Sequence, residues 1–184
     1  GGQFLGGDPQ RGRTRFEEAL ERLSDAGLVA RRNEPPAATY TFKHALVQDA
    51  AYDSLLKSRR KELHTAIALA IEDEVVRSAE PEWIAHHHTQ AGNLSEAVPL
   101  WRRAGALAVE RLALREAVAH FEKGLGLIRQ LPPSIERDRL ELSIREPLNA
   151  AFTGLRGWAA KEVGENAEAI LRLTASHVDK RTTK

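Results

Sequence analysis

The spacing of apolar residues along the chain changes at His44. Before His44, Tyr40 and Phe42 alternate with polar residues, which is the period of a half-buried strand. After it, the apolar positions follow helical spacing, at Leu46, Val47, Ala50, Ala51 and Leu55. The pattern predicts a short strand that runs directly into a buried helix, with His44 at the joint.

The residues ahead of this joint predict one small unit. Residues 1–13 are rich in glycine and are expected to form a linker. Thr14–Glu17 fits a capping box, so a helix is predicted to begin at Thr14 and to end at the C-capping Gly27. A strand at 28–31, a loop with two prolines and a strand at 40–42 follow. Helix, strand, loop and strand are the back half of a winged helix.

The residues after the joint predict one helix after another. Pro81 suits the first turn of a helix, and Pro147 is expected to kink or end one. We therefore assign residues 14–79 to a winged-helix-like domain with its connecting helix, residues 80–175 to helical repeats, and residues 176–184 to a disordered tail.

One spacing of small, large and small residues occurs twice in the helical part, as Ala97-x3-Trp101-x2-Ala104 and Ala117-x3-Phe121-x2-Gly124. It is typical of the second helix of a tetratricopeptide repeat (TPR). The two copies lie 20 residues apart, against ~34 in a regular repeat, and a third appears only at Ala167-x3-Leu171. The predicted fold is mainly α: a winged-helix-like subdomain with a short β-hairpin, followed by an irregular TPR-like α-helical array.

Composition limits the function classes. The 27 basic and 26 acidic residues leave a formal net charge of +1, so no overall field attracts nucleic acid or a membrane. No Cys is present, which excludes disulfides and thiolate metal sites. No apolar run approaches the ~20 residues that span a bilayer, and we expect a cytoplasmic location. The chain opens with Gly1-Gly2 and contains no Met, which predicts a piece of a longer protein.

The N-terminal glycines contain one phosphate-loop spacing, from Gly7 to Thr14, with Arg13 where a lysine is required. The loop also needs a buried strand before it, and residues 3–5 are too few to supply one. We reject a P-loop here.

Several blocks of sequence occur in a distinctive order: Tyr40-x-Phe42-Lys43-His44-Ala45-Leu46-Val47-Gln48-Asp49-Ala50-Ala51-Tyr52, Arg60-x2-Leu63-His64, Ala85-His86-His87-x2-Gln90-Ala91-Gly92, Ala97-Val98-x2-Trp101-x-Arg103-Ala104-Gly105, Glu116-Ala117-Val118-Ala119-His120-Phe121 and Gly157-Trp158-Ala159. Across residues 14–174 this order resembles the segment after the nucleotide-binding core in bacterial signal-transduction ATPases of the STAND class. It is most similar to the group in which a cyclase domain precedes an ATPase and TPR repeats.

The resemblance implies a role for His44. Lys43–Val47 is similar to a motif of related STAND proteins in which the histidine contacts the β-phosphate of bound ADP, although Ala45 stands where that motif has an aspartate. In the intact parent the cofactor would be ATP or ADP, with His44 as phosphate sensor. We expect no cofactor and no metal in this fragment. The alternative for His44 is a capping or packing histidine.

Three other groups offer weaker candidate sites. His86, His87 and His88 are consecutive, and helical geometry turns them about 100° apart, so a shared metal ion is not expected. The basic runs at 31–32 and 59–61 are expected to be solvated faces rather than DNA contacts. The aromatic residues Trp101, Phe121 and Trp158 are expected to anchor the core.

These observations predict a non-catalytic regulatory and protein-interaction segment of a nucleotide-dependent signal-transduction ATPase associated with a nucleotide cyclase. Its expected partners are an upstream nucleotide-binding domain and an unknown protein or small ligand on the helical repeats, with no membrane. No catalytic residue is assigned. The alternative is a winged-helix DNA-binding transcriptional regulator with a helical-repeat sensor.

Overall fold

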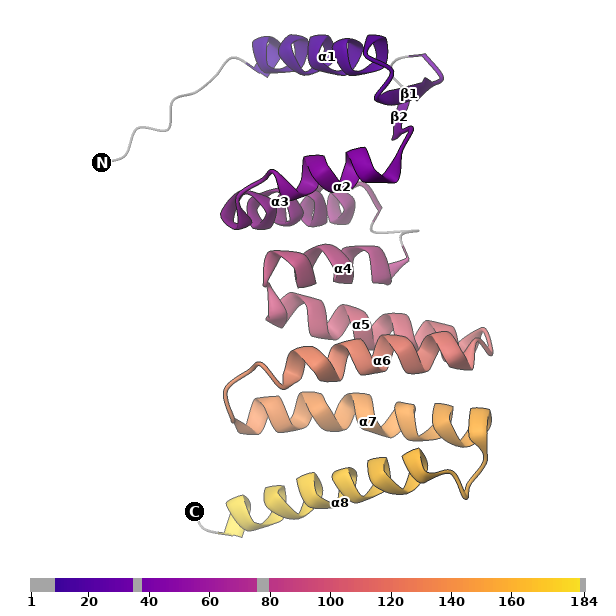
Figure 1. Cartoon of the computed structure of the whole chain (residues 1–184). Helices are drawn as coiled ribbons and strands as arrows, with labels where there is room; N and C mark the ends of the chain where they lie inside the picture. Colours follow the sequence, from indigo (N-terminus) through magenta and orange to yellow (C-terminus); the bar gives the residue numbers. More distant parts are fainter. Residues whose placement is uncertain (1–8, 35–37, 76–79, 183–184) are drawn as a thin grey trace, which may run out of the picture. The chain divides into compact units, whose positions relative to one another are not determined.

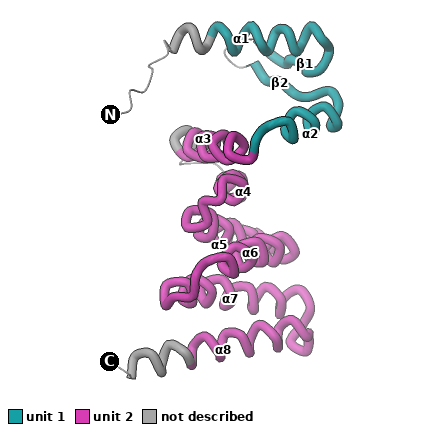
Figure 2. Tube along the Cα trace, turned by 60° about the vertical axis from the view of Figure 1, so that its left-hand side comes forward, with its two compact units in different colours: residues 1–56 teal, residues 57–184 magenta. Residues whose placement is uncertain are grey.

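A computed structural model describes residues 9–34, 38–75 and 80–182. The fold is mainly α with a short antiparallel β-hairpin, as predicted. The chain divides into two compact units, residues 1–56 and residues 57–184 (Figure 2), and each is described by itself.

The first unit has the predicted order of helix, strand, strand and helix. Its elements are α1 (Pro9–Asp25), β1 (Val29–Arg32), β2 (Thr39–Phe42) and α2 (Ala45–Asp53). The start of α1 differs from the prediction, because the helix begins at Pro9 rather than Thr14. Proline suits a first helical turn, and the residues after it extend the helix backwards past the capping-box sequence. The rejected phosphate-loop spacing and the expected linker fall partly on residues 1–8, outside the described residues.

The turn between α1 and the hairpin is set by Gly27. This glycine has φ +69°, and its N–H donates to the carbonyl of Ser24 while the N–H of Leu28 donates to that of Leu23. The two bonds form a Schellman motif, for which glycine is favoured because a Cβ would be strained at this φ. The predicted C-cap is confirmed. The strands then pair antiparallel, with Val29 opposite Phe42.

The burial of α2 differs from the prediction. This helix was predicted to be buried, yet it contains no buried residue, and Leu46 is 82% exposed. Among the side chains described in this unit, Val29 alone is buried. One helix and a hairpin of four-residue strands present too little apolar surface to cover α2. The helical pattern is correct, but the burial it suggested is absent.

The second unit is a stack of helices in which each helix packs on the next along the chain (Figure 1). Two of its boundaries follow the predicted signals, since Pro81 opens α4 and Gly92 closes it at φ +85°. The helix α5 also contacts α7. The helices are α3 (Lys57–Val75), α4 (Pro81–Ala91), α5 (Leu94–Glu110), α6 (Leu114–Ile128), α7 (Ile135–Arg156) and α8 (Lys161–Thr182).

Three boundaries in the helical stack differ from the predictions. The helix α3 packs on α4 and belongs to the second unit, so the division falls at residue 57 rather than at 80. Pro147 lies inside α7, which continues to Arg156 because neighbouring helices pack along it. The last helix reaches Thr182 and so extends into the segment expected to be a disordered tail.

The core of the stack lies at the repeated small–large–small positions. Trp101 and Phe121 are buried, as predicted, and Phe121 is fully so. Trp158, also predicted in the core, is 83% exposed, because it lies in the turn between α7 and α8 rather than on a helix face. The third copy of the spacing fails as well. Leu171 is 69% exposed, and α8 buries Val163, Asn166 and Ala169 instead.

Candidate functional site

His44 lies at the joint that the sequence predicted. It is the N-cap of α2, with extended backbone, and its carbonyl accepts hydrogen bonds from the N–H groups of Val47 and Gln48 at 3.1 and 3.3 Å. The imidazole makes no capping hydrogen bond and the residue is exposed. Neither the capping nor the packing explanation therefore accounts for the side chain.

Apolar side chains near His44 in the sequence are uncovered as well. Phe42, two residues before it, is 38% exposed, and Leu46 and Tyr52 on α2 are 82% and 39% exposed. Isolated exposed apolar residues are ordinary. Here three large ones lie between positions 42 and 52, close in sequence to the exposed imidazole, and such side chains suit contact with another protein. We call His44, Phe42, Leu46 and Tyr52 the α2 face.

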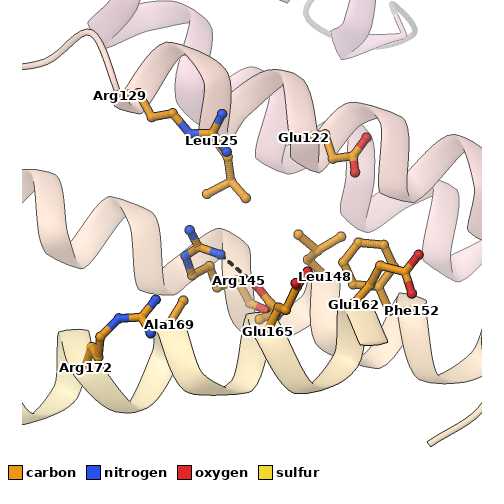
Figure 3. Close-up of a pocket in the computed structure, with 11 residues that line it drawn as sticks. Glu122, Leu125, Arg129, Arg145, Leu148, Phe152, Glu162, Glu165, Ala169 and Arg172 are labelled. Atoms are coloured by element: carbon orange, nitrogen blue, oxygen red, sulfur yellow. Dashed lines mark hydrogen bonds between the residues drawn. The ribbon is translucent and has the colours of Figure 1, made fainter. Parts of the chain in front are cut away.

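A second candidate lies in the helical unit, where α6, α7 and α8 enclose a cavity of about 560 Å³ (Figure 3). Its size falls within the range of small-molecule and peptide sites, which is roughly 300–1,000 Å³. The floor comes from α7, through Leu148 and Phe152, and is continued by Leu125 of α6 and Ala169 of α8. We call this cavity the α6–α8 groove.

Charges of opposite sign gather at the two ends of the groove. Figure 3 shows Arg129, Arg145 and Arg172 together at one end, and Glu122 with Glu162 toward the other, beside Phe152. Glu122 is on α6 and Arg129 is the C-cap of that helix, seven residues further on, which is about 10 Å along the helix axis. The groove therefore offers cationic and anionic groups on either side of an apolar floor.

The base of the groove is fixed by a buried amide. Asn166 is buried, and its Nδ2 donates to the carbonyl of Arg145 at 2.8 Å and to Asn149 Oδ1 at 3.2 Å. Its Oδ1 accepts from the Arg145 guanidinium at 2.9 Å. Arg145 is also paired with Glu141 at 2.7 Å. These bonds hold the Arg145 side chain in place, because a buried amide loses free energy unless its polar atoms are satisfied.

Other groups on the groove remain available to a ligand. Within the described residues, no ion pair is found for Arg129 or for Glu122. Arg172 has one long contact of 3.8 Å with Glu168, and both side chains are largely exposed. A bound carboxylate could therefore take up Arg129 without displacing an internal partner. Nothing in the sequence pattern identified this groove, since its lining residues are distributed over three helices.

The three consecutive histidines point in different directions, as helical geometry requires. One of them, His87, contacts a histidine of another helix, which the sequence did not indicate. His88 is buried, with Nε2 3.1 Å from Glu72, whereas His86 is exposed. His87 Nδ1 lies 2.8 Å from Nδ1 of His64 on α3. Burial lowers the pKa of both His64 and His87 below the usual histidine value, and neighbouring imidazoles lower it further.

The basic runs are partly neutralised by nearby acids. Arg31 pairs with Glu34 at 3.1 Å, and Arg59 pairs with Glu62 at 2.9 Å. Both pairs are exposed, so each contributes little to stability. They nevertheless place a carboxylate next to a guanidinium that a phosphate backbone would otherwise contact.

Comparison with known proteins finds a similarity to a longer bacterial protein. The chain is 30% identical over 172 residues to the uncharacterized protein R02095 of Rhizobium meliloti (strain 1021). The similarity covers 89% of this chain but 16% of that protein, so the chain spans about a sixth of its curated relative. No protein-family model and no solved structure matches. Within the described ranges, every helix is too short or too polar to cross a lipid bilayer.

Proposed function

We propose that this chain is a non-catalytic regulatory and protein-interaction segment of a cytoplasmic, nucleotide-dependent signal-transduction ATPase associated with a nucleotide cyclase. The observation that carries the proposal is the α2 face, where His44 and three large apolar side chains close to it in the sequence are all exposed. An upstream nucleotide-binding domain would cover the apolar side chains. An imidazole N–H of His44 would then donate to the phosphate of bound ADP, assisted by free N–H groups of the first turn of α2.

The α6–α8 groove supports the interaction part of the proposal. Its apolar floor and its oppositely charged ends suit a short peptide segment that carries both signs of charge. The similarity to a much longer uncharacterized protein also supports a role as part of a larger chain.

The nucleotide role is tested in the parent protein, produced with the coding region upstream of Gly1. We expect His44→Ala to accelerate dissociation of a fluorescent ADP analogue by about tenfold to a hundredfold, since a hydrogen bond to a charged group contributes roughly 1.5–3 kcal/mol. Gln48→Ala is the matched control, because Gln48 is exposed one turn further along α2. Equal dissociation rates in wild type and His44→Ala would contradict the proposed phosphate contact.

The absence of catalysis and of DNA binding can be measured on the 184-residue chain alone. We expect no ATP hydrolysis and no cyclase turnover, and no retardation of duplex DNA at low salt. Measurable DNA binding, with an association constant whose logarithm falls linearly with the logarithm of salt concentration, would instead favour the DNA-binding alternative. In that case Arg31→Ala and Arg59→Ala should each weaken it.

A further inference from the structure

We propose that Glu82, Glu116 and His120 form a binding site for a divalent first-row transition metal ion of the Zn²⁺ type. Glu82 lies in the first turn of α4, and Glu116 and His120 are one turn apart on α6. One possible ligand atom from each residue lies within 4.8 Å of the other two. This site goes beyond the proposed nucleotide and peptide functions and does not depend on either of them.

The topology explains how residues from two separate helices meet. Because α5 runs antiparallel to both of its neighbours, α4 and α6 begin on the same side of the stack (Figure 1). Their first turns therefore lie at the same edge of the unit.

The histidine supplies a ligand whose orientation is already fixed. His120 is 7% exposed, and its ring stacks on Trp101 with a centroid distance of 5.4 Å. Trp101 is itself buried and donates from Nε1 to Thr89 at 2.9 Å. The imidazole therefore loses little side-chain freedom when it binds an ion.

The distances suit a small ion. His120 Nε2 lies 3.4 Å from Glu116 Oε1, and donor atoms of a tetrahedral ion with bonds near 2.1 Å lie about 3.4 Å apart. Glu116 is half exposed, and Glu82, which is partly exposed, can move inward to complete the set. Three protein ligands leave the fourth position of a tetrahedral ion for water, as in catalytic zinc sites.

Charge also favours an ion at this place. Within the described residues, neither Glu82 nor Glu116 is paired with a lysine or an arginine. Two carboxylates so close together repel each other, and a dication relieves that repulsion. Two carboxylate oxygens with one imidazole nitrogen suit Zn²⁺ and its neighbours better than Ca²⁺, which takes oxygen ligands.

The second ring nitrogen of His120 limits the affinity expected for the metal ion. The buried Nδ1 of His120 has no hydrogen-bond partner among the described residues. In established sites the second ring nitrogen of a metal-binding histidine donates to a carboxylate, a carbonyl or a water. We therefore expect an exchangeable ion rather than one retained through purification. A bound ion would join α4 to α6, which otherwise meet mainly through α5.

The test is a calorimetric titration of the full chain with Zn²⁺. The His64–His87 pair offers a competing place for the ion, so all titrations use the His87→Gln background. There we expect one Zn²⁺ per chain and a rise in Tm with Zn²⁺. Adding Glu82→Gln or Glu116→Gln should weaken binding by more than about tenfold, the effect of losing even an outer partner in known sites.

Glu110→Gln is the matched control, since it removes the same charge from an exposed position at the end of α5. It should leave both the affinity and the Tm shift unchanged. Absence of Zn²⁺ binding in the His87→Gln background would overturn the proposal. An unchanged Zn²⁺ affinity in either Glu82→Gln or Glu116→Gln would overturn it as well.

Discussion

At the scale of single residues, Gly105 sets how closely α5 approaches α6. A Cβ placed on Gly105 would lie 2.5 Å from Cε1 of Phe121, a separation that real side chains do not tolerate. Phe121 itself is fully buried. The space left by the missing side chain of Gly105 on α5 is therefore filled by the ring of Phe121, the large residue of the second copy of the spacing.

We expect Gly105→Ala to destabilise the chain by about 1–3 kcal/mol, because overpacking a close-packed core costs that much. Gly126→Ala is the control, since Gly126 is also in a helix but nothing lies within 4 Å of its added Cβ. That variant should gain about 0.5–1 kcal/mol from the better helix propensity of alanine. Urea denaturation measures both. If Gly105→Ala left the free energy of unfolding unchanged, the two helices would have to move apart at little cost.

At this scale the spacing predicted burial correctly for two aromatic residues, one on α5 and one on α6. Trp101 and Phe121 were placed in the core by their spacing and are buried. Trp158 is aromatic and was also placed there, but it is in a turn and exposed. Periodicity identifies the apolar side of a helix. Whether that side is covered, and where a side chain in a turn points, depends on the chain around it.

At the scale of elements, the contact between α3 and α4 includes an imidazole pair. His64 Nδ1 and His87 Nδ1 are 2.8 Å apart, so one nitrogen must donate a proton and the other must accept it. Protonating both rings would set two N–H groups against each other. Electrostatic repulsion from His86 also lowers the pKa of both rings, and repulsion from His88 lowers that of His87. Glu72 of α3 lies beside His88.

This pair should make stability depend on pH. The pKa values of His64 and His87 are lowered in the folded state, whereas in the unfolded chain a histidine titrates near ~6.5. Below that value the unfolded state binds more protons, so the unfolding free energy falls as pH decreases from about 7 toward the folded pKa values. The stabilisation is present above ~6.5 and is lost on acidification.

We expect His87→Gln to flatten this decline, measured by urea denaturation at pH 7.5 and 5.5. His64→Gln should do the same, and the double variant should add little to either, because the two rings act as one pair. Retention of the wild-type pH dependence in His87→Gln would count against the pair as its source. Sequence patterns do not reveal this contact, since 23 residues separate the two histidines.

At the scale of the whole molecule, burial is concentrated in the second unit. The core consists mainly of residues from α5, α6 and α7, together with Ala85 of α4 and Val163 of α8. In the first unit, Val29 alone is buried among the described side chains. Local opening requires little free energy where few apolar side chains are buried.

Hydrogen exchange on the full chain should therefore show two levels of protection. We expect the amides of α5, α6 and α7 to exchange slowest, near the limit of global unfolding, and those of α2 to exchange much faster. Binding of an upstream domain to the α2 face should then slow exchange in α2 specifically. Equal protection of α2 and α6 in the isolated chain would contradict the assignment of the core.

Local sequence signals were enough to predict the order and type of most elements, the place of the hairpin and the ends of several helices. Periodicity, capping residues and glycines at positive φ act locally, so they can be read without the rest of the fold. The sequence also placed His44 at the strand-to-helix joint. Four features became visible only in the packed fold: the exposure of α2, the place of α3 in the second unit, the α6–α8 groove, and the cluster of Glu82, Glu116 and His120. Each of these depends on which distant segments pack together, and packing partners leave no local pattern in the chain.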